Sequence, residues 1–253
     1  MIRLKNREEL DQIRASGALL AETFEVIRPL VIPGVTTAAI DAAAHRHITS
    51  AGGRPAFLGY RDFPASVCAS LNNVVIHGIP GETVLTEGDI LSLDLGVILN
   101  GYYSDSAKTF SVGKISEGAT RLLEVTEECL ARAIHMVRPG HRIRDISRAV
   151  FDHADSFGYG VVHQYCGHGV GFELHEDPQV PNYLGKGPNP RLKPGMVLAI
   201  EPMLNAGTAE VNILADDWTV VTGDDGLSAH FEHTVAVTDS QPEILTLVGE
   251  NSG

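Results

Sequence analysis

The sequence has few cysteines, and they cannot form a disulfide framework. There are three, Cys68, Cys129 and Cys166, an odd number without a CxxC pair. Neither a network of disulfides nor a thiolate zinc site is expected from such a set. We therefore expect any metal ion to be held by nitrogen and oxygen ligands.

Long apolar runs and excess positive charge are also missing. The first twenty residues mix charged and apolar side chains, and no later run approaches the roughly 18 apolar residues of a membrane span. We expect a cytoplasmic protein with no membrane partner. Its 19 Lys and Arg stand against 32 Asp and Glu, a net charge of −13, which argues against DNA or RNA as the main partner because phosphate binding needs a basic face.

What the sequence does contain is an ordinary globular composition with two pairs of helical patterns. Apolar residues recur at helical spacing over residues 7–32 and again over about 36–51, and Pro33-Gly34 separates the two stretches. A second pair begins at Glu117, breaks at Pro139-Gly140, resumes near Ile143 and ends near Gly158. The chain thus repeats one helical arrangement.

Strand patterns repeat at almost the same distance. The two Pro-Gly pairs are 139 − 33 = 106 residues apart, and GDILSLD (residues 88–94) resembles GMVLAIE (residues 195–201) at an offset of 107. A period this long indicates a duplicated α+β unit with pseudo-two-fold symmetry rather than a solenoid. We expect one domain over residues 1–253, with related halves at about 8–112 and 117–238.

Strands are expected where β-branched or alternating residues are bounded by Gly, Pro or Asn. The expected strands are residues 65–71, 74–77, 90–98, 107–112, 196–204 and 230–238. The Gly- and Pro-containing stretch 182–194 is expected to be a loop.

Carboxylates stand at equivalent points of the two repeats. Asp94 ends GDILSLD and Glu201 ends GMVLAIE, and each shares a strand face with small or apolar residues. A carboxylate there costs several kcal/mol of desolvation unless it is paired or binds metal. Asp105 and Glu232 are two further candidates. Each one taken singly is also compatible with capping a turn or pairing with an arginine. Together they would repel one another without cations, and such ligands suit Mn, Fe, Co or Zn.

Three histidines stand apart from the others. His77 lies in VVIHGIP, and His168 and His175 lie in YCGHGVGFELHEDP. The glycines that flank His168 predict room for a ligand or a metal ion. The spacing of seven between His168 and His175 excludes the HExxH helix of many metalloproteases.

These motifs together resemble a known family. NNVVIHGIP, Asp94 and Asp105, YCGHGVG with His175 following, GMVLAIEPM and FEHTVAV occur in the order and spacing of type I methionine aminopeptidases. The resemblance covers nearly the whole chain and implies the pita-bread fold, in which a pseudo-two-fold antiparallel sheet is covered by two pairs of helices. That fold also accounts for the repeat.

The resemblance implies roles for individual residues. Two divalent ions (Co, Mn, Fe or Zn) would be bound by Asp94, Asp105, His168, Glu201 and Glu232. Asp105 and Glu232 would bridge the ions, and Glu201 would also shuttle a proton to and from the attacking hydroxide. His77 and His175 are similar to the family's catalytic and substrate-binding imidazoles.

The resemblance also implies a pocket for one methionine side chain. Its expected lining is Phe57, Tyr60, Phe63, Cys68, Leu174 and Trp218. Leu174 stands where the family usually has Phe, Phe57 where Cys is frequent, Glu173 where Gly is common and Asn73 where an acidic residue is usual. The first three departures are expected to affect the shape of the pocket.

The implied activity is removal of the initiator methionine from nascent polypeptide N-termini whose second residue is small, by a monomeric enzyme. Five arginines near Pro139-Gly140 add the hypothesis of a weak ribosome contact: Arg132, Arg138, Arg142, Arg144 and Arg148. They are also compatible with an ordinary solvated helix end whose arginines pair with nearby acids.

Two alternatives remain open. A proline-specific peptidase of the same fold would carry a separate N-terminal domain, whereas only residues 1–76 precede His77 here. An inactive pita-bread module that binds peptides would have lost metal ligands, and all five are present in this sequence.

Overall fold

The computed structural model describes residues 1–248, and the last five residues lie outside the described part. Its α-helices are α1 (Arg7–Ile27), α2 (Thr37–Ser50), α3 (Glu117–His135) and α4 (Ile143–Ser156), with short 3-10 turns η1 (Arg28–Leu30) and η2 (Tyr60–Asp62). Asn6, Thr36 and Ser116 cap α1, α2 and α3 by accepting a backbone N–H of the first turn. All four predicted helices are confirmed, with α1 ending earlier than expected.

The strands form antiparallel ladders throughout. In the first half they are β1 (Arg54–Pro55), β2 (Val67–Leu71), β3 (Val74–Ile76), β4 (Ile90–Leu99) and β5 (Tyr102–Ser111). In the second half they are β6 (Gly160–Val161), β7 (Gly167–Gly169), β8 (Glu176–Val180), β9 (Val197–Ile200), β10 (Met203–Asn205), β11 (Val211–Ile213), β12 (Val220–Thr222), β13 (Ser228–His230), β14 (His233–Ala236) and β15 (Glu243–Ile244). No strand crosses the stretch 182–194, which is a loop as predicted.

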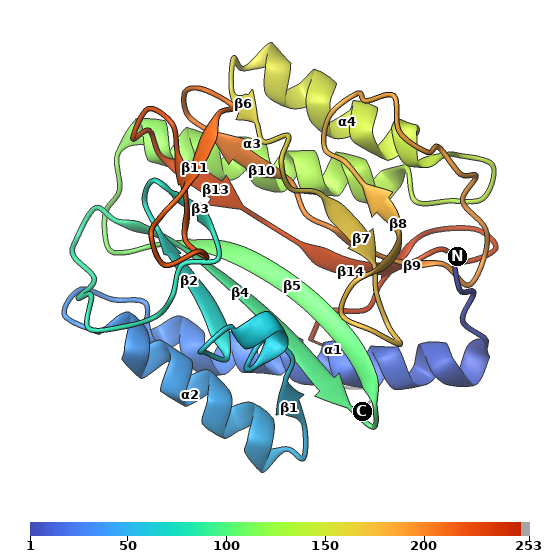
Figure 1. Cartoon of the computed structure of the whole chain (residues 1–253), viewed down its shortest axis with the longest axis horizontal. Helices are drawn as coiled ribbons and strands as arrows, with labels where there is room; N and C mark the ends of the chain where they lie inside the picture. The colour runs from blue at the N-terminus through green and yellow to red at the C-terminus, as the bar shows by residue number, and fades with distance from the viewer. Residues whose placement is uncertain (249–253) are drawn as a thin grey trace.

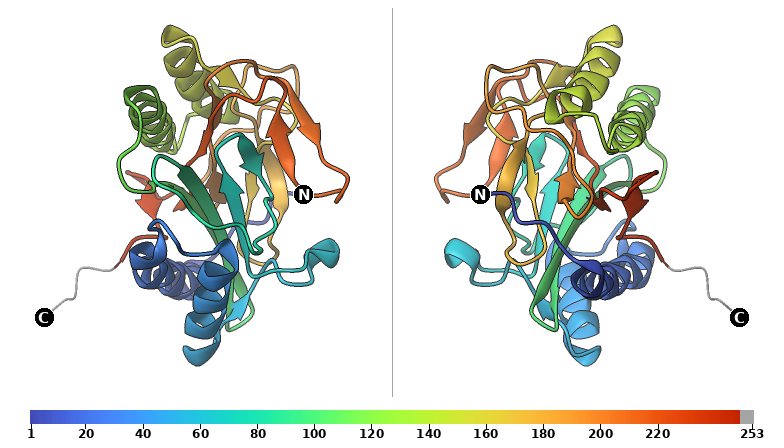
Figure 2. Two further views of the ribbon diagram at one scale, coloured as in Figure 1. Left: turned by 90° about the vertical axis from the view of Figure 1, so that its left-hand side faces the viewer. Right: turned by 90° about the vertical axis from the view of Figure 1, so that its right-hand side faces the viewer.

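The two halves place their helices on opposite sides of the strands. In Figure 1, α1 and α2 lie below the strands and α3 and α4 above them, and the turned views of Figure 2 keep this order. One apolar core joins α1 and α2 to Leu91, Leu93 and Leu95 of β4, and a second joins α3 and α4 to Leu198 and Ile200 of β9. The expected α+β architecture, with two pairs of helices covering antiparallel strands, is therefore confirmed.

Two expected strands are interrupted where the carboxylates lie. Residues 196–204 divide into β9 and β10, and residues 230–238 into β13 and β14. The register nevertheless continues across the gap, since Ile200 faces His233 and Met203 faces His230. Pro202 has no N–H to give to a ladder, so regular pairing stops beside it. The prediction of unbroken strands was wrong at this point.

The strand expected at 107–112 begins five residues earlier, at Tyr102. Its first part lacks an alternating apolar pattern because its buried side chains are polar and hydrogen-bonded: Ser104 Oγ lies 2.9 Å from Ser16 Oγ, and Ser106 Oγ donates to Glu232 O at 2.7 Å. Asp105 therefore lies within a strand.

Within residues 1–248, no helix combines the length and the apolar character needed to cross a lipid bilayer.

Candidate active site

One cavity of about 360 Å³ contains every site residue expected from the sequence. Its walls include the carboxylates Asp94, Asp105, Glu201 and Glu232, the imidazoles His77, His168 and His175, and the side chains Phe57, Tyr60, Phe63, Cys68, Leu174 and Trp218. The two halves of the repeat both contribute to it.

Strand register brings Asp94 and Asp105 together. Asp94 faces Ala107 and Asp105 faces Gly96 across the β4–β5 ladder. The two aspartates are thus diagonal neighbours on the same face, close enough for their side chains to interact. Asp105 is buried, with an exposed fraction of 4%, whereas Asp94 is partly buried.

Glu201 and Glu232 meet in the interruption of the second-half ladder. Glu201 follows Ile200, and Glu232 precedes His233. Because Ile200 pairs with His233, the same register places the two glutamates opposite each other. Hydrogen bonds from the first half fix this region: the Glu232 N–H donates to the Ala107 carbonyl at 2.8 Å. The carbonyl of Glu201 accepts from Asn182 Nδ2 at 2.9 Å.

His168 directs one ring nitrogen at these carboxylates. Its Nδ1 lies 2.9 Å from the Gly169 carbonyl and donates to it, which leaves the Nε2 lone pair facing the cavity. His168 Nε2 lies 3.4 Å from Glu201 Oε1 and 3.8 Å from Asp105 Oδ2. One ligand atom each of Asp105, His168 and Glu232 falls within a 4.8 Å cluster.

The glycines beside His168 serve backbone packing rather than ligand access. A Cβ on Gly167 would lie 2.4 Å from the Ala199 carbonyl oxygen, and one on Gly169 would lie 2.3 Å from the Asp177 carbonyl oxygen. The expectation that these glycines leave room for a ligand was therefore wrong. They allow β7 to fit between β8 and β9, and this fit presents His168 to the cavity.

The carboxylates of the site are suited to bind a cation, and within residues 1–248 no cationic Lys or Arg side chain lies beside them. Burial raises the pKa of Asp105, Glu201 and Glu232 well above the ordinary range, and repulsion from neighbouring carboxylates raises these pKa values further. Within residues 1–248, no Lys or Arg nitrogen lies within 4 Å of the carboxylates of Asp94, Asp105, Glu201 and Glu232. Asp94 Oδ1, Asp105 Oδ1 and Glu232 Oε1 are buried and have no hydrogen-bond partner among the described residues. Such oxygens around one imidazole nitrogen fit divalent metal ions.

His77 and His175 lie at the edge of this cluster. The His77 backbone adopts φ of 59°, a left-handed conformation that is strained for a residue with a side chain. Its ring packs edge-on against Trp218 at 5.8 Å, and the His175 ring stacks on Tyr60 at 5.3 Å. Burial lowers the pKa of both histidines to about 4, so both are neutral near pH 7.

An apolar lobe adjoins the carboxylates. Phe57, Phe63, Cys68 and Leu174 form one buried cluster, against which Trp218 packs. Phe63 and Trp218 meet edge-on at 5.0 Å. Phe57 lies over Gly96, where a Cβ would come within 2.8 Å of its ring. The lobe can enclose an unbranched apolar side chain.

The sequence did not single out His230, which also lines the cavity. Its exposed fraction is 2%, and neither of its ring nitrogens has a hydrogen-bond partner within residues 1–248. Nε2 lies 4.0 Å from Glu201 Oε2. The sequence could have pointed to His230 because it lies two residues before Glu232 in the same expected strand.

Two related halves that enclose buried carboxylates and an imidazole define a metallopeptidase of the pita-bread fold. A family model, metallopeptidase family M24, matches residues 11–239. A methionine aminopeptidase of Clostridium acetobutylicum is 50% identical over 248 residues, covering 98% of this chain and 99% of its own. The Escherichia coli methionine aminopeptidase is 44% identical over 248 residues, covering 97% of this chain and 94% of its own. The chain therefore belongs to metallopeptidase family M24 and, within it, to the methionine aminopeptidase family.

Solved structures agree with this assignment. The crystal structure of methionine aminopeptidase from Rickettsia prowazekii matches with a TM-score of 0.95 and 42% identity, covering 98% of this chain and 100% of that chain. Prolidase from Pyrococcus furiosus matches with a TM-score of 0.80 at 23% identity, and the match covers 98% of this chain but 66% of prolidase. That likeness shows the fold alone. The resemblance stated from the sequence motifs is confirmed.

Proposed function

We propose that this protein removes the N-terminal methionine of peptides and nascent proteins whose second residue is small. The observation that carries the proposal is one cavity in which an apolar lobe adjoins buried carboxylates without a counter-cation. The relatives named methionine aminopeptidase, similar over nearly their whole length, support the same activity.

We assign the metal ligands to the carboxylate and imidazole groups that converge. Two divalent ions, Co, Mn, Fe or Zn, would be held by Asp94, Asp105, His168, Glu201 and Glu232. Four carboxylates carry the charge that offsets two divalent cations, and Asp105 and Glu232 would contact both ions. Bound there, the ions would acidify a water molecule and polarise the carbonyl of the scissile bond.

The side chains of the protein would bind and orient the peptide and exchange protons with it. Glu201, whose Oε1 lies 3.4 Å from His168 Nε2, is suited to take the proton of the attacking water and return it to the leaving amine. His77 and His175 are neutral donors that would stabilise the developing oxyanion and the leaving nitrogen. The lobe formed by Phe57, Tyr60, Phe63, Cys68, Leu174 and Trp218 would hold the methionine side chain.

The proposal is tested with peptides on protein reconstituted with Co²⁺ or Mn²⁺. We expect Met-Ala-Ser to be cleaved after methionine, Leu-Ala-Ser at least tenfold more slowly, and Met-Leu-Ser hardly at all. A chelator should abolish the activity, and added metal should restore it. Equal cleavage of Leu-Ala-Ser and Met-Ala-Ser would contradict the specificity. Preferential cleavage of Xaa-Pro peptides would favour the proline-specific alternative, and no cleavage of any peptide would favour the inactive module.

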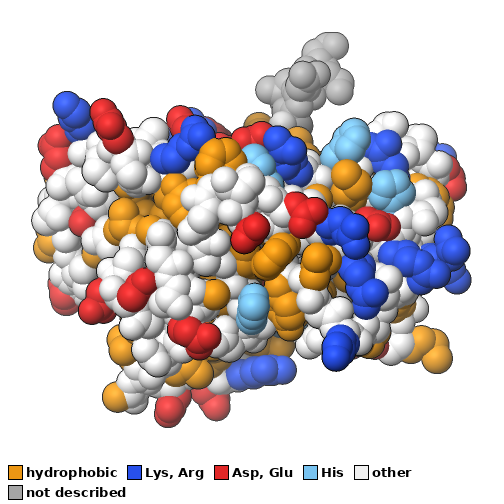
Figure 3. All heavy atoms as spheres, turned by 90° about the horizontal axis from the view of Figure 1, so that it is seen from above, with side chains coloured by type: hydrophobic (Ala, Val, Ile, Leu, Met, Phe, Trp, Pro, Cys, Tyr) orange, Lys and Arg blue, Asp and Glu red, His pale blue; other side chains and the backbone are white. Residues whose placement is uncertain are grey.

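We also propose that the enzyme acts as a cytoplasmic monomer that touches the ribosome weakly. Of the five arginines near Pro139-Gly140, only Arg132 has a carboxylate within 4 Å in residues 1–248, at 2.8 Å from Glu128. Arg148 is exposed on α4. Figure 3 views the molecule from above Figure 1, and in it Lys, Arg and His side chains gather toward the right-hand side. Uncompensated cations in a chain of net charge −13 are suited to a salt-sensitive contact with RNA phosphates.

A further inference from the structure

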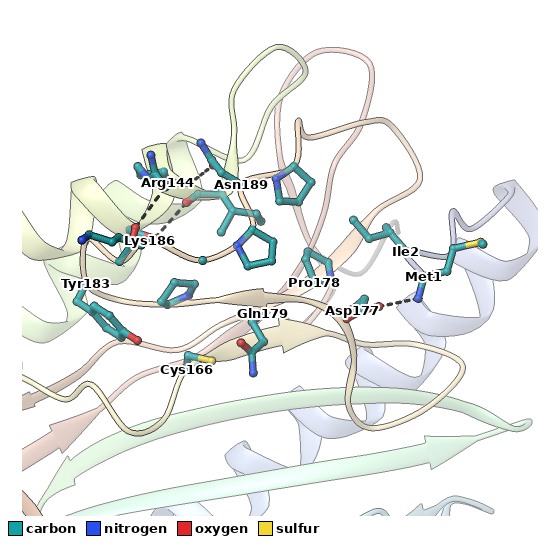
Figure 4. A pocket seen from close by; sticks show the side chains of 17 residues that line it. Met1, Ile2, Arg144, Cys166, Asp177, Pro178, Gln179, Tyr183, Lys186 and Asn189 are labelled. Carbon is teal, nitrogen blue, oxygen red and sulfur yellow. Dashed lines mark hydrogen bonds and ion pairs between the residues drawn. The ribbon is translucent and has the colours of Figure 1, made fainter.

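A second, larger cavity lies directly beside the catalytic cavity. Its volume is about 750 Å³, against about 360 Å³ for the catalytic cavity. Cys166 and Gln179 line both of them, so the two cavities meet at these side chains (Figure 4). A chain held at the catalytic centre would enter the second cavity if it extended past these two side chains.

Prolines restrict the backbone along part of the wall of this second cavity. Figure 4 shows Pro178 and Gln179 of β8 on one side, with Arg144 of α4 and the 183–190 loop on the other. Four of its lining residues are prolines, Pro178, Pro181, Pro188 and Pro190, whose backbone torsions are restricted. A preformed groove of this kind binds an extended chain with little cost in ordering the protein.

The charged groups of the cavity leave a net positive charge. Arg144 Nη2 donates to the Gly185 carbonyl at 3.2 Å, and Lys186 is exposed. In the part of the chain that the structure describes, neither cation has a carboxylate within 4 Å. Asp177, which also lines the cavity, is paired with the amino group of Met1 at 2.6 Å. Two cations thus remain uncompensated.

The direction of the substrate follows from the catalytic cavity. The apolar cluster of Phe57, Phe63 and Leu174 forms one wall and suits the N-terminal side chain. Cys166 and Gln179 do not belong to that cluster. The remainder of the peptide can leave past them, and at about 3.3 Å per residue an extended chain would place several residues in the second cavity.

We propose that this second cavity binds the part of the substrate beyond its second residue and favours acidic side chains there. The inference rests on the proposed aminopeptidase function and adds a subsite to it. The proposed preference for acidic side chains also opposes the electrostatic field of the whole protein, because a protein of net charge −13 attracts cationic peptides at long range. A preference for acidic peptides would therefore report local contacts.

The test compares Met-Ala-Ser-Glu-Glu-Gly with the matched Lys-Lys and Gln-Gln peptides at low salt. We expect kcat/KM to be at least fivefold higher for the Glu-Glu peptide than for the Lys-Lys peptide, mainly through KM, and the ratio to shrink as salt is added. In Lys186→Glu, and more strongly in the double variant with Arg144→Gln, the ratio should fall to one or reverse. Cleavage of Met-Ala-Ser should stay unchanged.

A charge-matched control separates the groove from the general field. The double variant Arg46→Gln with Lys114→Glu changes the net charge by the same amount as Lys186→Glu with Arg144→Gln, but at exposed positions outside this cavity. It should keep the wild-type ratio of kcat/KM between the Glu-Glu and Lys-Lys peptides. Lys186 makes no hydrogen bond or ion pair within residues 1–248, so Lys186→Glu tests the groove even if the double variant folds poorly. Equal kcat/KM for all three peptides in the wild type would overturn the inference, as would an equal loss of preference in the control. If Met-Ala-Ser itself is not cleaved, the proposed function fails as well.

Discussion

Asp105 and Thr234 exchange two hydrogen bonds across the two halves of the molecule. The Asp105 N–H donates to Thr234 Oγ1 at 2.9 Å, and Thr234 Oγ1 donates to the Asp105 carbonyl at 2.7 Å. The Thr234 side chain is fully buried. The hydroxyl of Thr234 thus fixes the backbone of Asp105 to β14, the strand that follows Glu232. Asp105 and Glu232 are both candidate metal ligands.

Replacing this hydroxyl should loosen the site. Thr234→Val keeps the volume but leaves a buried N–H and a carbonyl without partners, at a cost of about 1–3 kcal/mol of unfolding free energy. We expect a lower midpoint of urea unfolding, weaker metal affinity and lower kcat. Thr234→Ser, which keeps the hydroxyl, should stay close to wild type in metal affinity. If the Val variant binds metal as the wild type does, the bond has no positioning role.

The carboxylates assigned to both ions should be indispensable. Asp105→Asn or Glu232→Gln would leave two bound cations with one fewer carboxylate to offset their mutual repulsion. We expect more than a hundredfold loss of kcat in each variant, with far-UV circular dichroism unchanged. Exposed Asp152→Asn is the control and should be fully active. Retention of more than about a tenth of the wild-type rate, a barrier change under ~1.4 kcal/mol, would contradict the two-ion assignment.

Stability of the metal-free protein should fall as pH rises above about 6.5, the ordinary pKa of histidine. Burial raises the folded-state pKa of Asp105, Glu201 and Glu232 well above the ordinary values of 3.8 and 4.5. Between the ordinary and the raised pKa values the folded state binds more protons than the unfolded state, so stability is lost as pH rises. Below pH 6.5 the buried histidines act oppositely, since the pKa of His168 is lowered to about 3 and the unfolded chain takes up those protons.

Thermal unfolding from pH 5 to 9 measures this dependence. The midpoint for chelator-treated protein should decline between pH 7 and 9, and Mn²⁺ should raise it more at pH 8.5 than at pH 6. Glu232→Gln should flatten the decline in the absence of metal. A midpoint that rises with pH over 7–9 without metal would contradict the assignment of buried, unpaired carboxylates.

His77 should act on the substrate and not as a ligand. We expect His77→Ala to lower kcat by two to four orders of magnitude, the range for a positioned donor to an oxyanion or leaving group. Metal content after dialysis should stay at the wild-type level. His163→Ala, whose ring lies outside the catalytic cavity, serves as the control. Loss of metal from the His77 variant would place this side chain among the ligands.

Ribosome contact is best tested with arginines that do not support the 185–189 loop. Arg142 and Arg144 donate to carbonyls of that loop, whereas Arg148 lies exposed on α4. We expect Arg138→Ala with Arg148→Ala to reduce co-sedimentation with ribosomes severalfold, and added salt to weaken the wild-type contact steeply. Peptide hydrolysis should not change. Co-sedimentation unaffected by these substitutions would identify an ordinary solvated surface.

Sequence by itself determined the helices, the duplication and the candidate ligands. Helical periodicity that ends at Pro33-Gly34 or Pro139-Gly140 is local information, because proline and glycine act on their own turn. Asp94 and His168 could be singled out because a charged or imidazole group in an apolar or glycine-rich stretch is rare without a partner. The repeat of 106–107 residues also required only comparison of the chain with itself.

Tertiary structure alone decided how these groups converge. The register that sets Asp105 opposite Gly96 belongs to a local hairpin, since β5 follows β4 directly. The interruption that places Glu201 opposite Glu232, in contrast, depends on pairing between β9 and β14, which lie more than 30 residues apart in the chain. The polar start of β5 and the burial of His230 have no periodic signal because their contacts come from the other half, 126–129 residues away for Ser106 and Asp105. Long-range pairing supplies the partners that make such polar residues stable inside, and a local pattern cannot contain them.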